Sequence, residues 1–330
     1  MTERILSDQA LTPASCYQRR VAYSARVFRI TLRLAGIVLL VVQLVQAAMS
    51  LSAGGGVSIS IVLASAFAIV LMLSTLPPFL EKAIAKFSSR TRRASFGIYL
   101  YSFPFVLTGI LIWVKLSVGP TSDKWRYISS EGGLSEYGTA IAYLLIPLFT
   151  YQIARQFWRH NKKLMGWLYI LFTAGSFFIG MEELSWGQKI IGFEEPKFWA
   201  ENNVQSEFTF HNLAFYQNRF LHPSFILAGF LGSFCWVVLR YWQNRQPQSP
   251  ATDLSYILPD WPISSFFYPT LLYYSVYSYT DFKDRVEFLH SADEEHCEFI
   301  MSLGILLFVL IKFYQQGQAA DQIRRNKLSS

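Results

Sequence analysis

Eight long apolar stretches constrain this chain more than any other feature of its sequence. They cover about 31–50, 56–80, 95–117, 137–157, 164–183, 223–242, 261–279 and 297–315. Each is close to the roughly 20 residues that a helix needs to cross about 30 Å of hydrocarbon. Their apolar residues are continuous rather than alternating, which excludes barrel strands. Helices remain, because backbone groups in lipid must be satisfied within their own segment.

The composition agrees with a membrane protein. Of the 330 residues, 52% are hydrophobic and only 15% are charged, against roughly 25% charged in ordinary soluble domains. We therefore predict an all-α, polytopic membrane bundle of about eight spans that forms a single domain over residues 1–330. The expected segments outside the bundle are an N-terminal tail (1–30), an exterior cap of interfacial helices (182–222) and a C-terminal tail (316–330).

The basic residues indicate how the bundle lies in its membrane. With the N-terminus in the cytoplasm, 21 of the 29 lysines and arginines fall on the cytoplasmic side, as the positive-inside rule requires. We expect both termini in the cytoplasm, a bacterial cytoplasmic membrane, and a first span that directs insertion in place of a cleaved signal peptide. The net charge of +7 then reflects topology and anionic lipid, and nucleic acid is not an expected partner.

Two adjacent acids, Glu182 and Glu183, end the fifth apolar stretch in the sequence "GMEELSWGQK". Carboxylates at the edge of a hydrocarbon layer cost a few kcal/mol unless something balances them. They also lie at the C-terminal end of a predicted helix, where the helix dipole is unfavourable for negative charge. The pair is therefore either exposed to water at the interface or part of a site in which a metal ion, a nearby Arg or Lys, or a proton shared between carboxylates balances its charge.

Further ionisable residues fall in the predicted exterior loops. His211 follows Glu207 by four residues and His296 follows Asp293 by three, so on a helix each pair would share a face and could aim two ligands at one ion. The alternative for the acids at 293–298 is capping of the last span, which the dipole favours. No HExxH or CxxC motif supports a metal. The predicted metal ligands, for zinc or iron, are Glu183, His211, His290, Asp293 and His296.

The polar residues of the three exterior loops are expected to converge at the outer interface. Glu183 would act as a ligand or general base, His211 as a ligand or acid, and Trp186 with neighbouring phenylalanines as a lipid-facing wall. The candidate catalytic residues are Glu182, Glu183, Gln188, Glu207 and His211. The expected supporting residues are Glu131, Glu136, Trp186, Gln205, Asn212, Glu294 and Glu295.

The segment 180–213 resembles the signature of a widespread group of polytopic bacterial membrane proteins. That signature is an acidic pair followed by Ser-Trp-Gly-Gln, Gly-Phe-Glu-x-Pro, Asn-x-Gln-x-Glu and His-Asn. The matching positions are Glu182, Glu183, Ser185, Trp186, Gly187, Gln188, Gly192, Phe193, Glu194, Pro196, Asn203, Gln205, Glu207, His211 and Asn212. A weaker similarity covers 130–140. The resemblance implies that these residues form one unit, and it implies no particular activity.

Three functions fit these observations. The first is a membrane-embedded enzyme that hydrolyses, transfers or oxidises a lipid or lipid-linked substrate entering laterally, using a carboxylate and histidine site. The second is a transporter with an exterior cation or proton site, which the nearly complete apolar inner halves of the spans disfavour. The third is a scaffold or assembly factor whose polar cluster fastens the cap. The expected partners are membrane lipids and a lipid or lipid-linked substrate, and the sequence leaves open whether there are protein partners.

Overall fold

A computed structural model describes isolated residues between 26 and 72 and the segments 96–130, 132–203, 207–213, 216, 220–245, 255–279 and 293–328. Much of the predicted spans 31–50 and 56–80 lies outside these residues, as do Glu131, Gln205 and His290. The chain divides into two compact units, Met1–Leu100 and Tyr101–Ser330. The second unit carries the candidate site and is the one described below.

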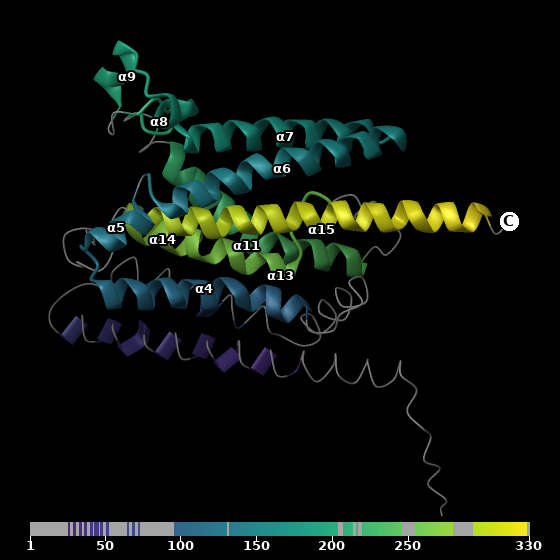
Figure 1. Cartoon of the computed structure of the whole chain (residues 1–330). Coiled ribbons are helices and arrows are strands. Elements are labelled where there is room, and N and C mark those ends of the chain that lie inside the picture. Colours follow the sequence, from purple (N-terminus) through teal and green to yellow (C-terminus); the bar gives the residue numbers. More distant parts are fainter. Residues whose placement is uncertain are drawn as a thin grey trace, which may run out of the picture. The chain divides into compact units, whose positions relative to one another are not determined.

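The described residues form an all-helical protein, in which an isolated antiparallel bridge joins Asn203 and Leu213. Among the described residues, five helical stretches are long and apolar enough to cross a membrane, and they coincide with five of the eight predicted spans. The helices that carry them are α4 (Phe96–Val118), α6 (Leu134–Arg159), α7 (Lys163–Glu183), α11 (His222–Arg245) and α15 (Glu294–Leu328) (Figure 1). A short helix, α5 (Asp123–Ser129), lies between α4 and α6.

The predicted span 261–279 is helical but broken. It consists of α13 (Trp261–Ser264), a 3-10 turn η3 (Ser265–Phe267) and α14 (Tyr268–Tyr279). Its first eight residues are all buried. Several of its polar side chains bond within the protein, for example the Thr270 hydroxyl, which donates to the Cys297 carbonyl at 2.9 Å. The segment is rich in Tyr and Ser because it packs inside the bundle, where such groups can be satisfied.

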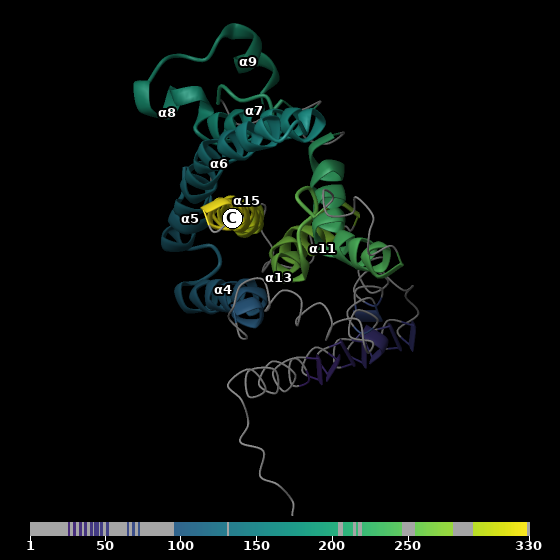
Figure 2. The same ribbon diagram turned by 90° about the vertical axis from the view of Figure 1, so that its right-hand side faces the viewer.

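Helix α15 packs between α6 and α14, as the end-on view along α15 shows (Figure 2). Glycines permit close packing on both sides of α15. A Cβ at Gly138 of α6 would lie 2.6 Å from the Phe299 ring, and a Cβ at Gly304 of α15 would lie 2.4 Å from Phe266 of η3, which directly precedes α14. Small residues at helix crossings let backbones come close. Because α15 continues to Leu328, most of the predicted C-terminal tail (316–330) is helical.

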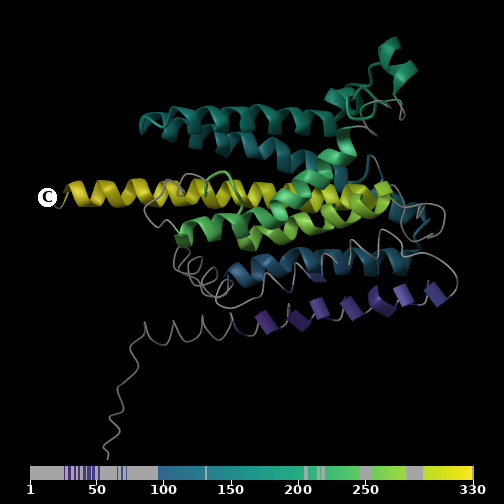
Figure 3. The ribbon, with the colours of Figure 1, turned by 180° about the vertical axis from the view of Figure 1, so that it is seen from behind.

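Helices α6 and α7 form an antiparallel hairpin (Figure 3). The turn between them includes Asn161 with a φ of 58°, a left-handed conformation that Asn tolerates well. Across the hairpin the hydroxyls of Thr150 and Thr173 lie 2.8 Å apart. The antiparallel arrangement brings Glu136, near the start of α6, to the same end of the bundle as Glu182 and Glu183 at the end of α7.

Candidate functional site

The chain reverses sharply after α7. Ser185, Trp186 and Gly187 have φ values of 48°, 52° and 88°, and left-handed backbone costs a residue other than glycine roughly 1–2 kcal/mol. Side chains on both sides hold this turn. The Trp186 indole N–H donates to the Glu182 carboxylate, and the Ser185 hydroxyl donates to the Glu207 carboxylate at 2.8 Å. The sequence Ser-Trp-Gly therefore forms a strained turn that polar contacts stabilise.

Glu182 fastens the following segment to the end of α7. Its carboxylate accepts hydrogen bonds from the backbone N–H groups of Phe210 at 2.7 Å and His211 at 3.1 Å. The His211 Nδ1 atom lies 3.4 Å from the same carboxylate. Although Glu182 is only 4% exposed, these donors and the Trp186 indole satisfy it and offset the unfavourable dipole at the helix end.

Residues 207–213 form turns rather than the helix expected from the sequence. The shared face predicted for Glu207 and His211 is therefore wrong. Polar side chains shape the segment instead: the Gln188 carbonyl oxygen accepts from the Phe208 N–H at 2.5 Å, and the Asn203 amide donates to the Glu207 carbonyl. Bonds of this kind give the backbone an alternative to helix.

Two short helices complete the cap segment, α8 (Gln188–Ile191) and α9 (Lys197–Asn202). The rings of Trp199 and Phe208 lie 4.9 Å apart. The Trp186 ring, predicted to be part of a lipid-facing wall, packs against Phe178 of α7 at 5.5 Å. Ile190 and Ile191 on α8 are large apolar residues that are 74% and 76% exposed. Neither was among the residues predicted from the sequence.

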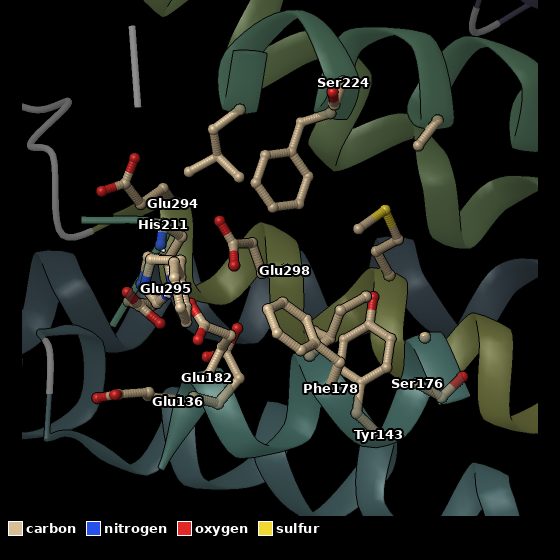
Figure 4. Close-up of a pocket in the computed structure, with 18 of the residues that line it drawn as sticks. Glu136, Tyr143, Ser176, Phe178, Glu182, His211, Ser224, Glu294, Glu295 and Glu298 are labelled. Carbon is tan, nitrogen blue, oxygen red and sulfur yellow. Dashed lines mark hydrogen bonds and ion pairs between the residues drawn. The ribbon is translucent and has the colours of Figure 1, made fainter. Parts of the chain in front are cut away.

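A cavity of about 640 Å³ lies between the 207–213 segment and helices α6, α7, α11, α14 and α15 (Figure 4). One end is lined by acids and a histidine, and the other by apolar groups. The polar end is formed by Glu136, Glu182, Glu183, Glu207, His211, Asn212, Glu294, Glu295 and Glu298. The apolar part includes Phe172, Ile179, Ala228, Phe267, Met301 and Ile305. On α15 the lining extends from Glu294 to Ile305, about 16 Å at 1.5 Å per residue.

The carboxylates in this cavity differ in their partners. Glu136 accepts from the Gly132 N–H, and Glu298 accepts from the Tyr274 hydroxyl. The Oε2 atom of Glu295 is buried with no hydrogen-bond partner, while the negative charges of Glu298, Glu183 and Glu136 act on it. Carboxylates this close cannot all ionise without a proton or a cation between them.

The carboxylates around His211 favour its protonated form. Burial by itself lowers the pKa of His211, but the hydrogen bond to Glu182 and the charges of Glu183 and Glu298 outweigh it and raise the pKa from 6.5 to about 9. The side chain is 29% exposed. The site thus holds an imidazolium that can donate a proton, next to carboxylates that can accept one.

This raised pKa predicts how stability depends on pH. A group that binds its proton more tightly when folded stabilises the folded state below its unfolded pKa of 6.5, and this contribution disappears as pH rises through about 9. We expect the melting temperature of the wild type to exceed that of His211→Gln at pH 6, and the difference to vanish near pH 10. Its size is at most about 3 kcal/mol. If the difference in melting temperature between the two proteins is the same at every pH, the pKa of His211 is not raised in the folded state.

Of the four predicted metal ligands that the structure describes, Glu183 and His211 line the same cavity, but Asp293 and His296 have other partners. The Asp293 carboxylate lies 2.5 Å from the Lys115 Nζ atom, and the His296 Nδ1 atom lies 2.6 Å from the Ser135 hydroxyl. Neither Asp293 nor His296 lines the cavity. Within the segments that the structure describes, no group of three or more His, Cys, Asp or Glu side chains is placed to hold a metal ion.

Several cavity residues were not predicted from the sequence. Glu298 is the most important, and its spacing could have revealed it, because it follows Glu294 by four residues and Glu295 by three and so shares their helix face. Tyr143 and Tyr274 carried no such signal, since they lie in apolar stretches. Asn212, predicted as a supporting residue, is 2% exposed and its amide nitrogen has no partner.

Comparisons with protein-family models, curated proteins and solved structures found no match to this chain. The resemblance of residues 180–213 to a membrane-protein signature therefore stays a prediction. Any function has to be argued from the chemistry of the site itself.

Proposed function

We propose that this chain is a membrane-embedded enzyme acting on a lipid or lipid-linked substrate. The observation that carries the proposal is the two-ended cavity, which has acids and an imidazolium at one end and apolar side chains over the rest of its length. A pocket of this kind suits an amphiphile whose polar part is to react and whose hydrocarbon is to be held. An apolar lining would serve little purpose for a small hydrophilic ion.

In this proposal His211 and Glu183 perform acid and base chemistry. His211 stays protonated at neutral pH because its pKa is about 9, so it acts as the general acid or as the cation that stabilises developing negative charge. Glu183 is 9% exposed and lines the cavity, and it acts as the general base. Glu182 is a positioning residue, since its contacts hold His211 in place.

Acid and base catalysis is preferred here over a metal mechanism. The His, Cys, Asp and Glu side chains in the described segments form no group suited to hold an ion, whereas His211 and the carboxylates already provide proton donors and acceptors. Orientation follows from the distribution of basic residues: we propose that the cavity end lined by acids faces the exterior of a bacterial cytoplasmic membrane and that both termini are cytoplasmic.

Lipid turnover tests this proposal. The protein is reconstituted in vesicles made from a bacterial polar lipid extract, and the lipids are followed over time by mass spectrometry. We expect one lipid class to be converted by the wild type and the rate to fall at least about 100-fold in Glu183→Gln. Glu201→Gln, on the exposed surface of α9, should keep the wild-type rate. Identical lipid profiles with and without the protein would overturn the proposal.

A further inference from the structure

The described lining of the cavity contains seven glutamates and one histidine but no lysine or arginine. His211 is already engaged by Glu182. Glu295 has the clearest need for a partner, because it is 9% exposed and its Oε2 atom accepts no hydrogen bond. A carboxyl oxygen that is buried without a hydrogen-bond partner costs free energy, and the negative charges of Glu298, Glu183 and Glu136 act on the same group, so a ligand that brings positive charge or a hydrogen-bond donor would complete the site.

Two other polar atoms that line the cavity are also buried without a partner. The amide nitrogen of Asn212 and the hydroxyl of Ser176 both lack partners, both side chains are 2% exposed, and both residues line the cavity. Buried polar groups in proteins are nearly always hydrogen-bonded. Three unsatisfied atoms on one cavity, contributed by α7, α15 and the 207–213 segment, indicate a ligand that supplies polar contacts.

The cavity walls also fit a cation. Glu298, whose carboxylate projects between Glu182 and Ser224 in Figure 4, is flanked by aromatic residues that line the same space, including Tyr143, Phe178 and Tyr274. Aromatic faces attract ammonium groups by about 0.5–2 kcal/mol each. Beyond this region the lining becomes apolar as far as Ile305, which leaves room for hydrocarbon.

We propose that the ligand of this cavity is a cationic amphiphile, an amine-bearing lipid whose ammonium group lies against Glu295 and Glu298 while its hydrocarbon chain extends along α15 toward Ile305. The inference rests on the proposed function and specifies its substrate class. It differs from a metal site because an organic ammonium needs scattered carboxylates and aromatic faces rather than three ligands at fixed distances.

The effect of head-group charge on binding can be separated from that of the hydrocarbon chain with three single-chain amphiphiles of equal length. Dodecylammonium, dodecanol and dodecanoate are titrated into the full-length protein in an uncharged glycoside detergent, and binding is measured by native mass spectrometry and by the shift in melting temperature. We expect dodecylammonium to bind the wild type at least about tenfold more tightly than the other two, because only it can pair with the carboxylates.

Variants of the cavity test where the ammonium group and the hydrocarbon chain of the ligand bind. Glu295→Gln and Glu298→Gln should each weaken dodecylammonium binding about tenfold or more. Glu295→Gln should keep the melting temperature of the ligand-free protein, because a neutral side chain of the same size replaces a carboxyl group that lies among the negative charges of Glu298, Glu183 and Glu136. Glu201→Gln removes the same charge from the exposed surface and should change nothing. Ile305→Trp fills the apolar end and should weaken all amphiphiles alike.

The outcomes distinguish this inference from the proposed function. If the three amphiphiles bind the wild type equally and Ile305→Trp weakens them all, the cavity holds lipid but the preference for a cation is refuted. If dodecylammonium binds as tightly to Glu295→Gln and Glu298→Gln as to the wild type, the assigned carboxylates are wrong. If no amphiphile binds the folded protein, the inference and the proposed function both fail.

Discussion

Replacing His211 by Ala is expected to lower lipid turnover by about 100-fold to 10,000-fold, the range typical of a lost general acid. The structure also predicts that the variant folds. Glu182 would lose the imidazole but keep the backbone N–H groups of Phe210 and residue 211 and the indole of Trp186. The cap would therefore stay fastened to α7, and the loss would be chemical rather than structural.

The matched control is His160→Ala, which removes a histidine from the exposed turn between α6 and α7. It should keep full turnover. Melting temperature and limited proteolysis of the cap segment at pH 9 or above, where His211 is losing its proton, should be nearly equal for the wild type and His211→Ala. A His211→Ala protein that retains more than about a tenth of the wild-type rate would exclude His211 as the acid.

Replacing Lys115 by Met is expected to destabilise the protein by about 3–5 kcal/mol, the usual cost of removing one partner from a buried ion pair. The Lys115 Nζ atom lies 2.5 Å from Asp293, and the two side chains are 3% and 11% exposed. The ammonium group also lies 5.5 Å from the centre of the Trp125 ring. Without it, the Asp293 carboxylate loses its lysine at the start of α15, where α4, α5 and α15 meet.

A second ion pair in the chain provides the comparison. Lys197 and Glu201 lie 3.9 Å apart on α9 with side chains 90% and 62% exposed, and pairs of this kind contribute little. Lys197→Met should leave the melting temperature almost unchanged. The double variant Lys115→Met/Asp293→Leu should recover most of the loss because both charges are gone. Equal melting temperatures for Lys115→Met and Lys197→Met would show that the buried Lys115–Asp293 pair contributes no more to stability than the exposed pair does.

The lengths of the apolar stretches predicted the helices of the second unit well, because lipid forces backbone groups to bond within their own segment. The prediction of one continuous spanning helix at 261–279 was less accurate. That stretch has the length of a span, but it packs within the bundle in three short pieces. Hydropathy measures transfer out of water and does not distinguish a helix surrounded by lipid from one surrounded by other helices.

The candidate site was predictable where the signal was local. Glu182, Glu183 and His211 do meet, since the acids end a helix and the histidine lies on the segment that returns to it. The reason they meet was not predictable, because it depends on backbone N–H groups of a non-helical turn. Asp293 and Glu298 show the opposite case. Both belong to one acidic run, yet which of them lines the cavity is decided by the packing of α15 against α6 and α14.

The left-handed turn at Ser185 to Gly187 makes the end of α7 and the 207–213 segment depend on one another. The side chains that hold this segment lie close together in the sequence, at Glu182, Ser185 and Gln188, on both sides of the turn. Left-handed backbone at a residue other than glycine persists only where the surrounding contacts hold it. A substitution at any of these three positions is therefore expected to disturb both the turn and the placement of His211, whose backbone N–H donates to Glu182.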